Sequence, residues 1–184
     1  MTLGLATGTW DAIYLGIESG GIPQDAPPGY PDLDRALTSK MVELQARPLV
    51  VFLGSGGLLR WLNVVCGYQR SGSLSEAVSK IQCLLARREC WHEAYGLVCG
   101  FEGKQAMFSR VSSAKAQTTP PSVLSLDIVE PIGFDDLEAA KAAQEARNAI
   151  RGGMEPLLAV REAIECRLGL PNLMGPVETR TLRP

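Results

Sequence analysis

The sequence has 184 residues, with 20 acidic against 18 basic side chains and a formal net charge of −2. This length fits one domain, which we expect to span residues 1–184. The charge balance excludes a strongly basic surface for nucleic acid. The hydrophobic fraction of 46% is typical of a globular protein, and no apolar run reaches the length of a membrane span. We therefore expect a globular chain with its own core, and partners other than nucleic acid or membrane.

The first third of the chain is predicted to form short strands with a long loop among them. A Gly8-Thr9 turn between two β-rich segments predicts a hairpin. Residues 18–36, rich in glycine and proline, predict a long surface loop. The strands are predicted over residues 2–7, 11–17, 37–44 and 49–53.

The middle of the chain predicts two helices and then more strands. After a glycine break at residues 54–57, helical spacing runs over residues 58–65. Ser73 with Glu76 three residues later forms a capping box, which opens a second helix with an apolar stripe to Leu85. Three strands are predicted to follow, over residues 95–101, 105–111 and 123–129, and the first two form a hairpin.

The last third predicts two helices and one strand. Asp135 with Glu138 is a second capping signal, and it opens an alanine-rich helix to about Ile150. Residues 154–168 predict a further helix, and residues 175–182 a final strand. Paired helices between runs of strands do not suit a parallel, doubly wound sheet. They predict an α+β fold in which helices cover the outer faces of two stacked antiparallel sheets.

Metal, disulfide and cofactor chemistry are not expected. The five cysteines are odd in number, no pair has the C-x-x-C spacing, and His92 is the only histidine. The glycine turn at residues 54–57 lacks the lysine and hydroxyl residue that end a phosphate-binding loop. We therefore predict no metal and no cofactor. The cysteine usage favours a reducing, cytoplasmic compartment.

Thr2 is the first candidate for chemistry. If Met1 is removed, the Thr2 hydroxyl and its own α-amine form a nucleophile and a base within one residue. An α-amine has an ordinary pKa of about 7.7–8.0, so it can accept a proton near neutral pH. Many proteins begin with Met-Thr, and the motif alone favours an ordinary N-terminus.

Further segments along the chain strengthen this hypothesis. They occupy residues 2–6, 11–21, 39–42, 49–57, 130–135 and 173–177. In this order they resemble segments of the proteasome β-subunit and HslV family, the threonine branch of the N-terminal nucleophile hydrolases, near its small bacterial members. The resemblance implies a four-layer αββα sandwich with helix pairs outside.

The resemblance assigns four catalytic positions. Thr2 falls at the nucleophile, and Lys40 at the lysine whose charge favours deprotonation of that nucleophile. Glu18 falls at the acid that pairs with the lysine. Gly54 falls at the glycine whose backbone N–H forms the oxyanion hole. Three further positions, Gly20, Gly21 and Phe52, are predicted to contact substrate.

The chain also departs from the family pattern. Glu18 is one methylene longer than the family's aspartate, and Gly20 stands where many members carry arginine. Phe134 replaces a serine beside the threonine amine, and residues 170–173 lack a supporting aspartate. Phe52 takes the position that often floors the substrate pocket, which implies a narrow pocket.

The resemblance implies a threonine peptidase that cuts peptides or unfolded proteins within a homo-oligomeric ring or double ring. An ATP-driven unfoldase would have to be a separate protein, because the sequence holds no nucleotide motif. Two alternatives stay open. The missing serine and aspartate suggest a catalytically inactive ring or scaffold subunit, and Phe52 suggests an acylase for small amides.

Overall fold

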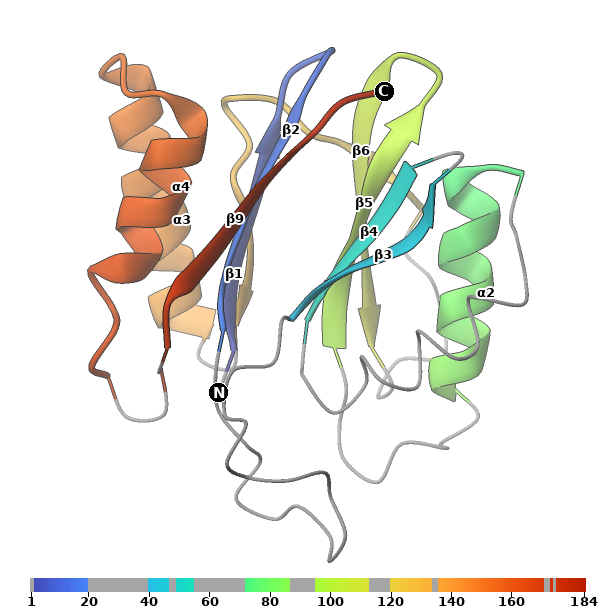
Figure 1. Cartoon of the computed structure of the whole chain (residues 1–184), viewed down its shortest axis with the longest axis horizontal. Helices are drawn as coiled ribbons and strands as arrows, with labels where there is room; N and C mark the ends of the chain where they lie inside the picture. Colours follow the sequence, from blue (N-terminus) through green and yellow to red (C-terminus); the bar gives the residue numbers. More distant parts are fainter. Residues whose placement is uncertain are drawn as a thin grey trace, which may run out of the picture.

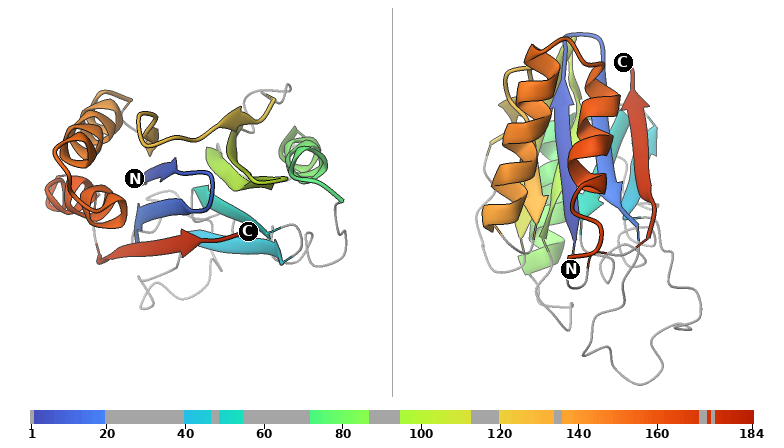
Figure 2. Two further views of the ribbon diagram at one scale, coloured as in Figure 1. Left: turned by 90° about the horizontal axis from the view of Figure 1, so that it is seen from above. Right: turned by 90° about the vertical axis from the view of Figure 1, so that its left-hand side faces the viewer.

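Two antiparallel sheets lie face to face in this protein, with helices on both outer sides (Figure 1). The computed structural model describes residues 2–19, 40–46, 49–54, 72–86, 95–112, 120–133, 136–170, 173 and 175–184. Seen from above, the layers run from the helices α3 and α4 through the two sheets to the helix α2 (Figure 2). The predicted α+β sandwich is confirmed. The helix predicted over residues 58–65, which would complete a second helix pair, lies outside the described residues.

The first sheet has the strand order β8-β1-β2-β9, and every neighbouring pair is antiparallel. Its strands are β1 (Leu3–Gly8), β2 (Ile13–Glu18), β8 (Glu130–Gly133) and β9 (Val177–Leu182). The predicted hairpin of β1 and β2 is confirmed, with Gly4 opposite Ile17. Glu18 is therefore the last residue of β2 and not part of the loop in which the sequence placed it.

The second sheet has the order β3-β4-β5-β6-β7. Its strands are β3 (Met41–Ala46), β4 (Leu49–Gly54), β5 (Tyr95–Glu102), β6 (Gln105–Ser112) and β7 (Ser122–Val123). The single strand predicted over residues 123–129 is wrong. The chain pairs with β6 as β7 up to Val123, turns between Ser125 and Ile128, and then pairs with β1 of the other sheet as β8. One straight strand cannot serve two sheets, so the turn divides it.

Capping residues set the starts of two of the helices, α2 (Leu74–Ala86) and α4 (Pro156–Glu165). The first bond of the predicted capping box is confirmed, because Ser73 Oγ accepts the Glu76 N–H at 3.1 Å, while the Glu76 carboxylate reaches back to the Gly72 N–H at 2.6 Å. α4 is shorter than the predicted 154–168: the Glu155 carboxylate caps it by accepting the Leu158 N–H at 2.8 Å, and Pro156 occupies its first turn. The cap thus starts the helix two residues later than the apolar pattern suggested.

The core has three parts, one between the sheets and one under each helical layer. The layer of α3 (Asp136–Arg151) and α4 approaches its sheet closely because small residues line the contact. Four alanines of α3 are buried, and a Cβ on Gly16 of β2 would lie 2.5 Å from Val160 Cγ1 of α4. This close packing holds β1 and β2 in place below the helices.

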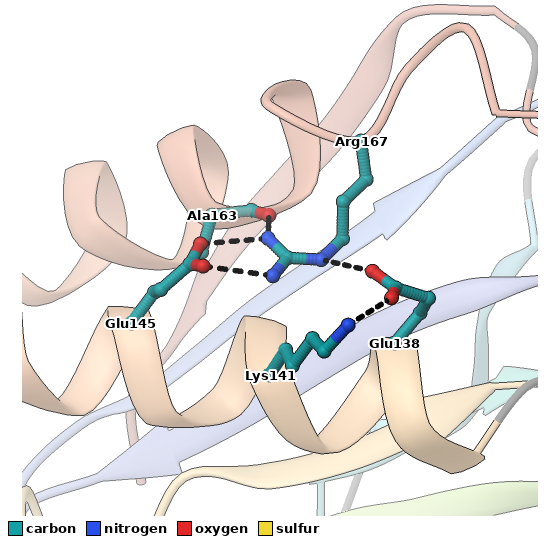
Figure 3. Close-up of polar contacts among 5 residues, drawn as sticks. All are labelled: Glu138, Lys141, Glu145, Ala163 and Arg167. Carbon is teal, nitrogen blue, oxygen red and sulfur yellow. Dashed lines mark hydrogen bonds and ion pairs between the residues drawn. The ribbon is translucent and has the colours of Figure 1, made fainter.

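Arg167 ties α4 to α3 (Figure 3). Its guanidinium donates to both Glu145 carboxylate oxygens, at 2.7 and 3.0 Å, and to the Ala163 carbonyl oxygen at 2.8 Å. The Arg167 side chain is 7% exposed, whereas Glu145 is largely in solvent. This geometry is bidentate, the arrangement in which an arginine–carboxylate pair is strongest.

We expect Arg167→Ala to lower the free energy of unfolding by about 1–2 kcal/mol, because it removes charge-assisted hydrogen bonds and buried stem packing. Denaturant unfolding measures this effect. Arg161→Ala is the matched control: its pair with Glu165 is exposed on both sides, and we expect a change below about 0.5 kcal/mol. Equal losses in the two variants would contradict the role assigned to Arg167.

Candidate functional site

Four strand ends meet at the end of the sandwich where the N-terminus lies (Figure 1). Thr2 directly precedes β1, Glu18 ends β2, Lys40 directly precedes β3, and Gly54 ends β4. Glu18 contacts Lys40 across the two sheets, and the Gly54 N–H donates to the Lys40 carbonyl oxygen at 3.1 Å. The structure thus brings together residues that the sequence separates by up to 52 positions.

Thr2 is buried at this edge, with 4% of its surface exposed. At this end of the hairpin Gly4 of β1 lies opposite Ile17 of β2. The next residues toward the edge are Leu3 and Glu18, and Thr2 directly precedes Leu3. The Leu3 backbone N–H also lies close enough to Glu18 to lower the pKa of that carboxyl group. The predicted nucleophile therefore sits one residue away from a group that interacts directly with Glu18.

Glu18 and Lys40 form an ion pair that solvent barely reaches. The side chains are 0% and 3% exposed, and Lys40 Nζ donates to Glu18 Oε1. A buried ion pair gains little net stability, because desolvation of both charges offsets their attraction. Buried pairs whose pKa values are shifted cluster at functional sites, which makes this pair a candidate for one.

Burial moves the pKa values of both Glu18 and Lys40 toward neutral pH. Desolvation raises the pKa of Glu18 to about 7, although the Lys40 charge and its hydrogen bond act in the opposite direction. Desolvation likewise lowers the pKa of Lys40, against the attraction of Glu18. The second carboxylate oxygen, Glu18 Oε2, is buried and has no partner of normal hydrogen-bond geometry in the described part of the chain.

Gly54 occupies a position with no room for a side chain. A Cβ there would lie 2.4 Å from Phe52 Cζ and 2.4 Å from the Tyr95 carbonyl oxygen. Its N–H, which the family resemblance assigns to the oxyanion hole, belongs to the ladder between the first residues of β3 and the end of β4. The oxyanion role of Gly54 stays a prediction, and it requires this amide to release the Lys40 carbonyl.

Of the three residues predicted to contact substrate, the structure describes only Phe52. Phe52 is fully buried in the apolar cluster under α2, where it lies with Leu74 and Val78. Its role as the floor of a substrate pocket stays a prediction. Gly20 and Gly21 lie outside the described residues.

Ser19 is a residue of this site that the sequence did not single out. It is buried, and both its Oγ and its N–H donate to the Pro176 carbonyl oxygen, at 2.7 and 2.9 Å. These bonds tie the end of β2 to the start of β9 beside the Glu18–Lys40 pair. Its position directly after Glu18 was the only signal in the sequence, because a lone serine has no pattern of its own.

The described ranges contain neither a candidate metal centre nor a helix that could span a membrane. No group of three His, Cys, Asp or Glu side chains there could hold a metal ion. None of the helices described is long and apolar enough to cross a membrane.

Comparison with known proteins gives a likeness in fold. No family model and no curated protein sequence matches the chain. Among solved structures it is similar to Anbu (ancestral beta-subunit) from Yersinia bercovieri, with a TM-score of 0.67 and 11% identity over 98% of this chain and 81% of that one. It is also similar to BPH from Thiobacillus denitrificans, solved in complex with epoxomicin, with a TM-score of 0.63 and 10% identity over 100% of this chain and 98% of that one.

A third similar structure is the eukaryotic HslV from Trypanosoma brucei, with a TM-score of 0.60 and 15% identity over the full length of both chains. At these identities the likeness shows the fold alone. The chain thus has the proteasome-like sandwich of HslV and Anbu.

Proposed function

We propose that this protein is a proteasome-type threonine hydrolase that cuts peptide bonds with Thr2 as its nucleophile. The observation that carries the proposal is the buried Glu18–Lys40 ion pair at the strand ends beside Thr2. The HslV-like fold supports it, because the chain has the architecture on which the sequence resemblance placed these residues.

The proposed reaction is acyl transfer. Thr2 Oγ attacks the peptide carbonyl carbon while the free Thr2 amine takes the hydroxyl proton. The Lys40 charge favours the developing oxygen anion of the nucleophile, and Glu18 holds Lys40 in place. The Gly54 N–H would stabilise the carbonyl oxyanion after it leaves the Lys40 carbonyl oxygen. The C–N bond then breaks, the leaving amine takes the proton from the Thr2 ammonium, and water releases the acyl group from Thr2.

The surroundings of the reaction belong to the same proposal. We propose peptides or unfolded proteins as substrates, a homo-oligomeric ring or double ring as the assembly, and a separate ATP-driven unfoldase as the partner. The likeness to Anbu and HslV supports these points at the level of fold.

Hydrolysis by a chain that begins at Thr2 tests the proposal. A fusion whose cleavage leaves Thr2 as the first residue supplies that chain, and a panel of fluorogenic peptides reports the rate. We expect Thr2→Ala to lose about a thousandfold or more in rate and Thr2→Ser to keep measurable turnover. Thr181→Ala, a threonine in the strand β9, is the matched control and should leave the rate unchanged. Full turnover by Thr2→Ala would contradict the proposal.

One observation favours a second candidate, a catalytically inactive ring subunit. The Gly54 N–H is occupied by the Lys40 carbonyl oxygen, so the donor assigned to the oxyanion is already bonded. This candidate predicts that the Thr2-first chain assembles into a ring and hydrolyses none of the peptides. Measuring assembly by light scattering beside the hydrolysis assay separates the two candidates.

A further inference from the structure

One oxygen of the Glu18 carboxylate meets no donor of normal hydrogen-bond geometry in the described part of the chain, although the Leu3 N–H acts on the group. Oε1 contacts Lys40 Nζ, whereas the buried Oε2 has no partner of normal geometry among the residues that the structure describes. A buried acceptor on a charged group costs free energy when it stays unsatisfied. Native proteins seldom leave such an atom alone without a functional reason.

The start of β1 is the neighbouring backbone. The Leu3 N–H acts on the Glu18 carboxyl group, and Thr2 precedes Leu3, with consecutive Cα atoms about 3.8 Å apart. Thr2 is 4% exposed with Met1 in place, so an amine formed there lies at a largely desolvated edge of the site, where an anionic partner stabilises its charge. Lys40, the charged side chain that the structure places against Glu18, has the same sign as an ammonium and cannot be that partner.

We propose that Glu18 Oε2 accepts a hydrogen bond from the α-ammonium of Thr2 once the chain before Thr2 has been removed. Glu18 is then the acid partner of the catalytic base, in addition to its contact with Lys40. This inference rests on the proposed function, because it assigns a role within the same reaction.

The proton balance of the reaction gives this contact its use. As the bond between Thr2 Oγ and the carbonyl carbon forms, the hydroxyl proton moves to the Thr2 nitrogen and the carbonyl oxygen becomes an anion. Glu18 stabilises the new ammonium without taking its proton. The ammonium then protonates the leaving nitrogen as the C–N bond breaks, and the amine is neutral again.

The length of the side chain suits two partners. The family that the sequence resembles has an aspartate at this position, and it sets a serine and a second aspartate around the threonine amine. This chain has Phe134 in place of that serine and no aspartate in residues 170–173. A glutamate extends one methylene further, so Oε2 can reach toward the amine while Oε1 keeps Lys40.

Titration of the Thr2 amine by NMR tests the proposal without requiring hydrolysis. The chain begins at Thr2 and carries isotope-labelled threonine, and the Thr2 resonance is followed against pH. An opposite charge in contact favours the protonated amine. We therefore expect the pH midpoint of Thr2 to fall by about one pH unit in Glu18→Gln. Glu102→Gln, at a half-buried carboxylate of the β5–β6 hairpin that accepts from Ser75 Oγ, should leave the midpoint unchanged.

Glu18→Asp keeps the test decisive if Glu18→Gln does not fold. It retains a carboxylate for Lys40 but is one methylene shorter, and we expect its midpoint to fall in the same direction. An unchanged Thr2 midpoint in both Glu18 variants, or in Glu18→Asp alone if Glu18→Gln is unfolded, overturns the proposal. If the Thr2 midpoint depends on Glu18 but the chain hydrolyses no peptide, only the proposed function is overturned. If the chain hydrolyses peptides but the Thr2 midpoint does not depend on Glu18, only this inference is overturned.

Discussion

Replacing Lys40 with methionine should lower the free energy of unfolding by about 3–5 kcal/mol at pH 8. The substitution keeps most of the buried volume but leaves Glu18 without its counter-ion in a fully buried position, where it must either hold a bare charge or take up a proton at pH 8, and both cost free energy. Denaturant unfolding of Lys40→Met and of the wild type at the same pH measures this loss.

The same variant should be less damaging at pH 5. Burial already raises the pKa of Glu18 to about 7, and loss of the Lys40 charge raises that pKa further. The unfolded chain ionises at its ordinary, lower pKa, so the folded state loses stability as pH rises through the window between the two values. At pH 5 the folded carboxyl group is neutral and needs no cation.

Glu18→Gln in the Lys40→Met background is the control for this prediction. It removes the charge that Lys40 no longer balances, so it should recover much of the loss at pH 8 and little at pH 5. A loss in Lys40→Met that is equal at pH 5 and pH 8 and is not recovered by Glu18→Gln would show that packing, and not charge, holds Lys40 in place.

Gly96→Ala should lower the free energy of unfolding by about 2–3 kcal/mol. Gly96 pairs with Gly54 across β4 and β5, and the Phe52 ring lies over both positions. A Cβ on Gly96 would lie 2.2 Å from Phe52 Cε2 and 2.6 Å from the Leu53 carbonyl oxygen. The ring can shift, but the carbonyl belongs to the strand and cannot. Thermal or denaturant unfolding measures the cost.

Two controls separate these contacts. Gly152→Ala, at the end of α3, places its Cβ no closer than 3.3 Å to other atoms and should change stability by less than about 0.5 kcal/mol. Phe52→Leu combined with Gly96→Ala should recover only part of the loss, because the Leu53 carbonyl stays in the way. A Gly96→Ala protein as stable as the wild type would contradict the packing described here.

The sequence correctly predicted features that depend on residues close together in the chain. The β1–β2 hairpin follows from its Gly8-Thr9 turn, and the start of α2 follows from Ser73 and Glu76, because turn and capping bonds join residues two to four positions apart. The strand predicted over residues 123–129 failed for the opposite reason. Its division depends on the ladder partners β6 and β1, which lie far away in the sequence.

The candidate site shows the same limit. The family resemblance selected Thr2, Glu18, Lys40 and Gly54, but only the folded chain shows the burial of Glu18 and Lys40 and the unpartnered Oε2. The bond from the Gly54 N–H to the Lys40 carbonyl oxygen depends on the register of β3 and β4, which no pattern in either strand specifies. The sequence did not predict a role for Ser19, because its hydrogen-bond partner Pro176 is 157 residues away.

The most direct test of the central claim is the intact mass of the Thr2-first chain after incubation with epoxomicin, the compound with which the similar BPH structure was solved. We predict one covalent adduct per chain, located at Thr2 by fragmentation, and none in Thr2→Ala or in a chain that keeps Met1. A folded Thr2-first chain whose mass is unchanged, or an adduct that persists in Thr2→Ala, would contradict Thr2 as the nucleophile.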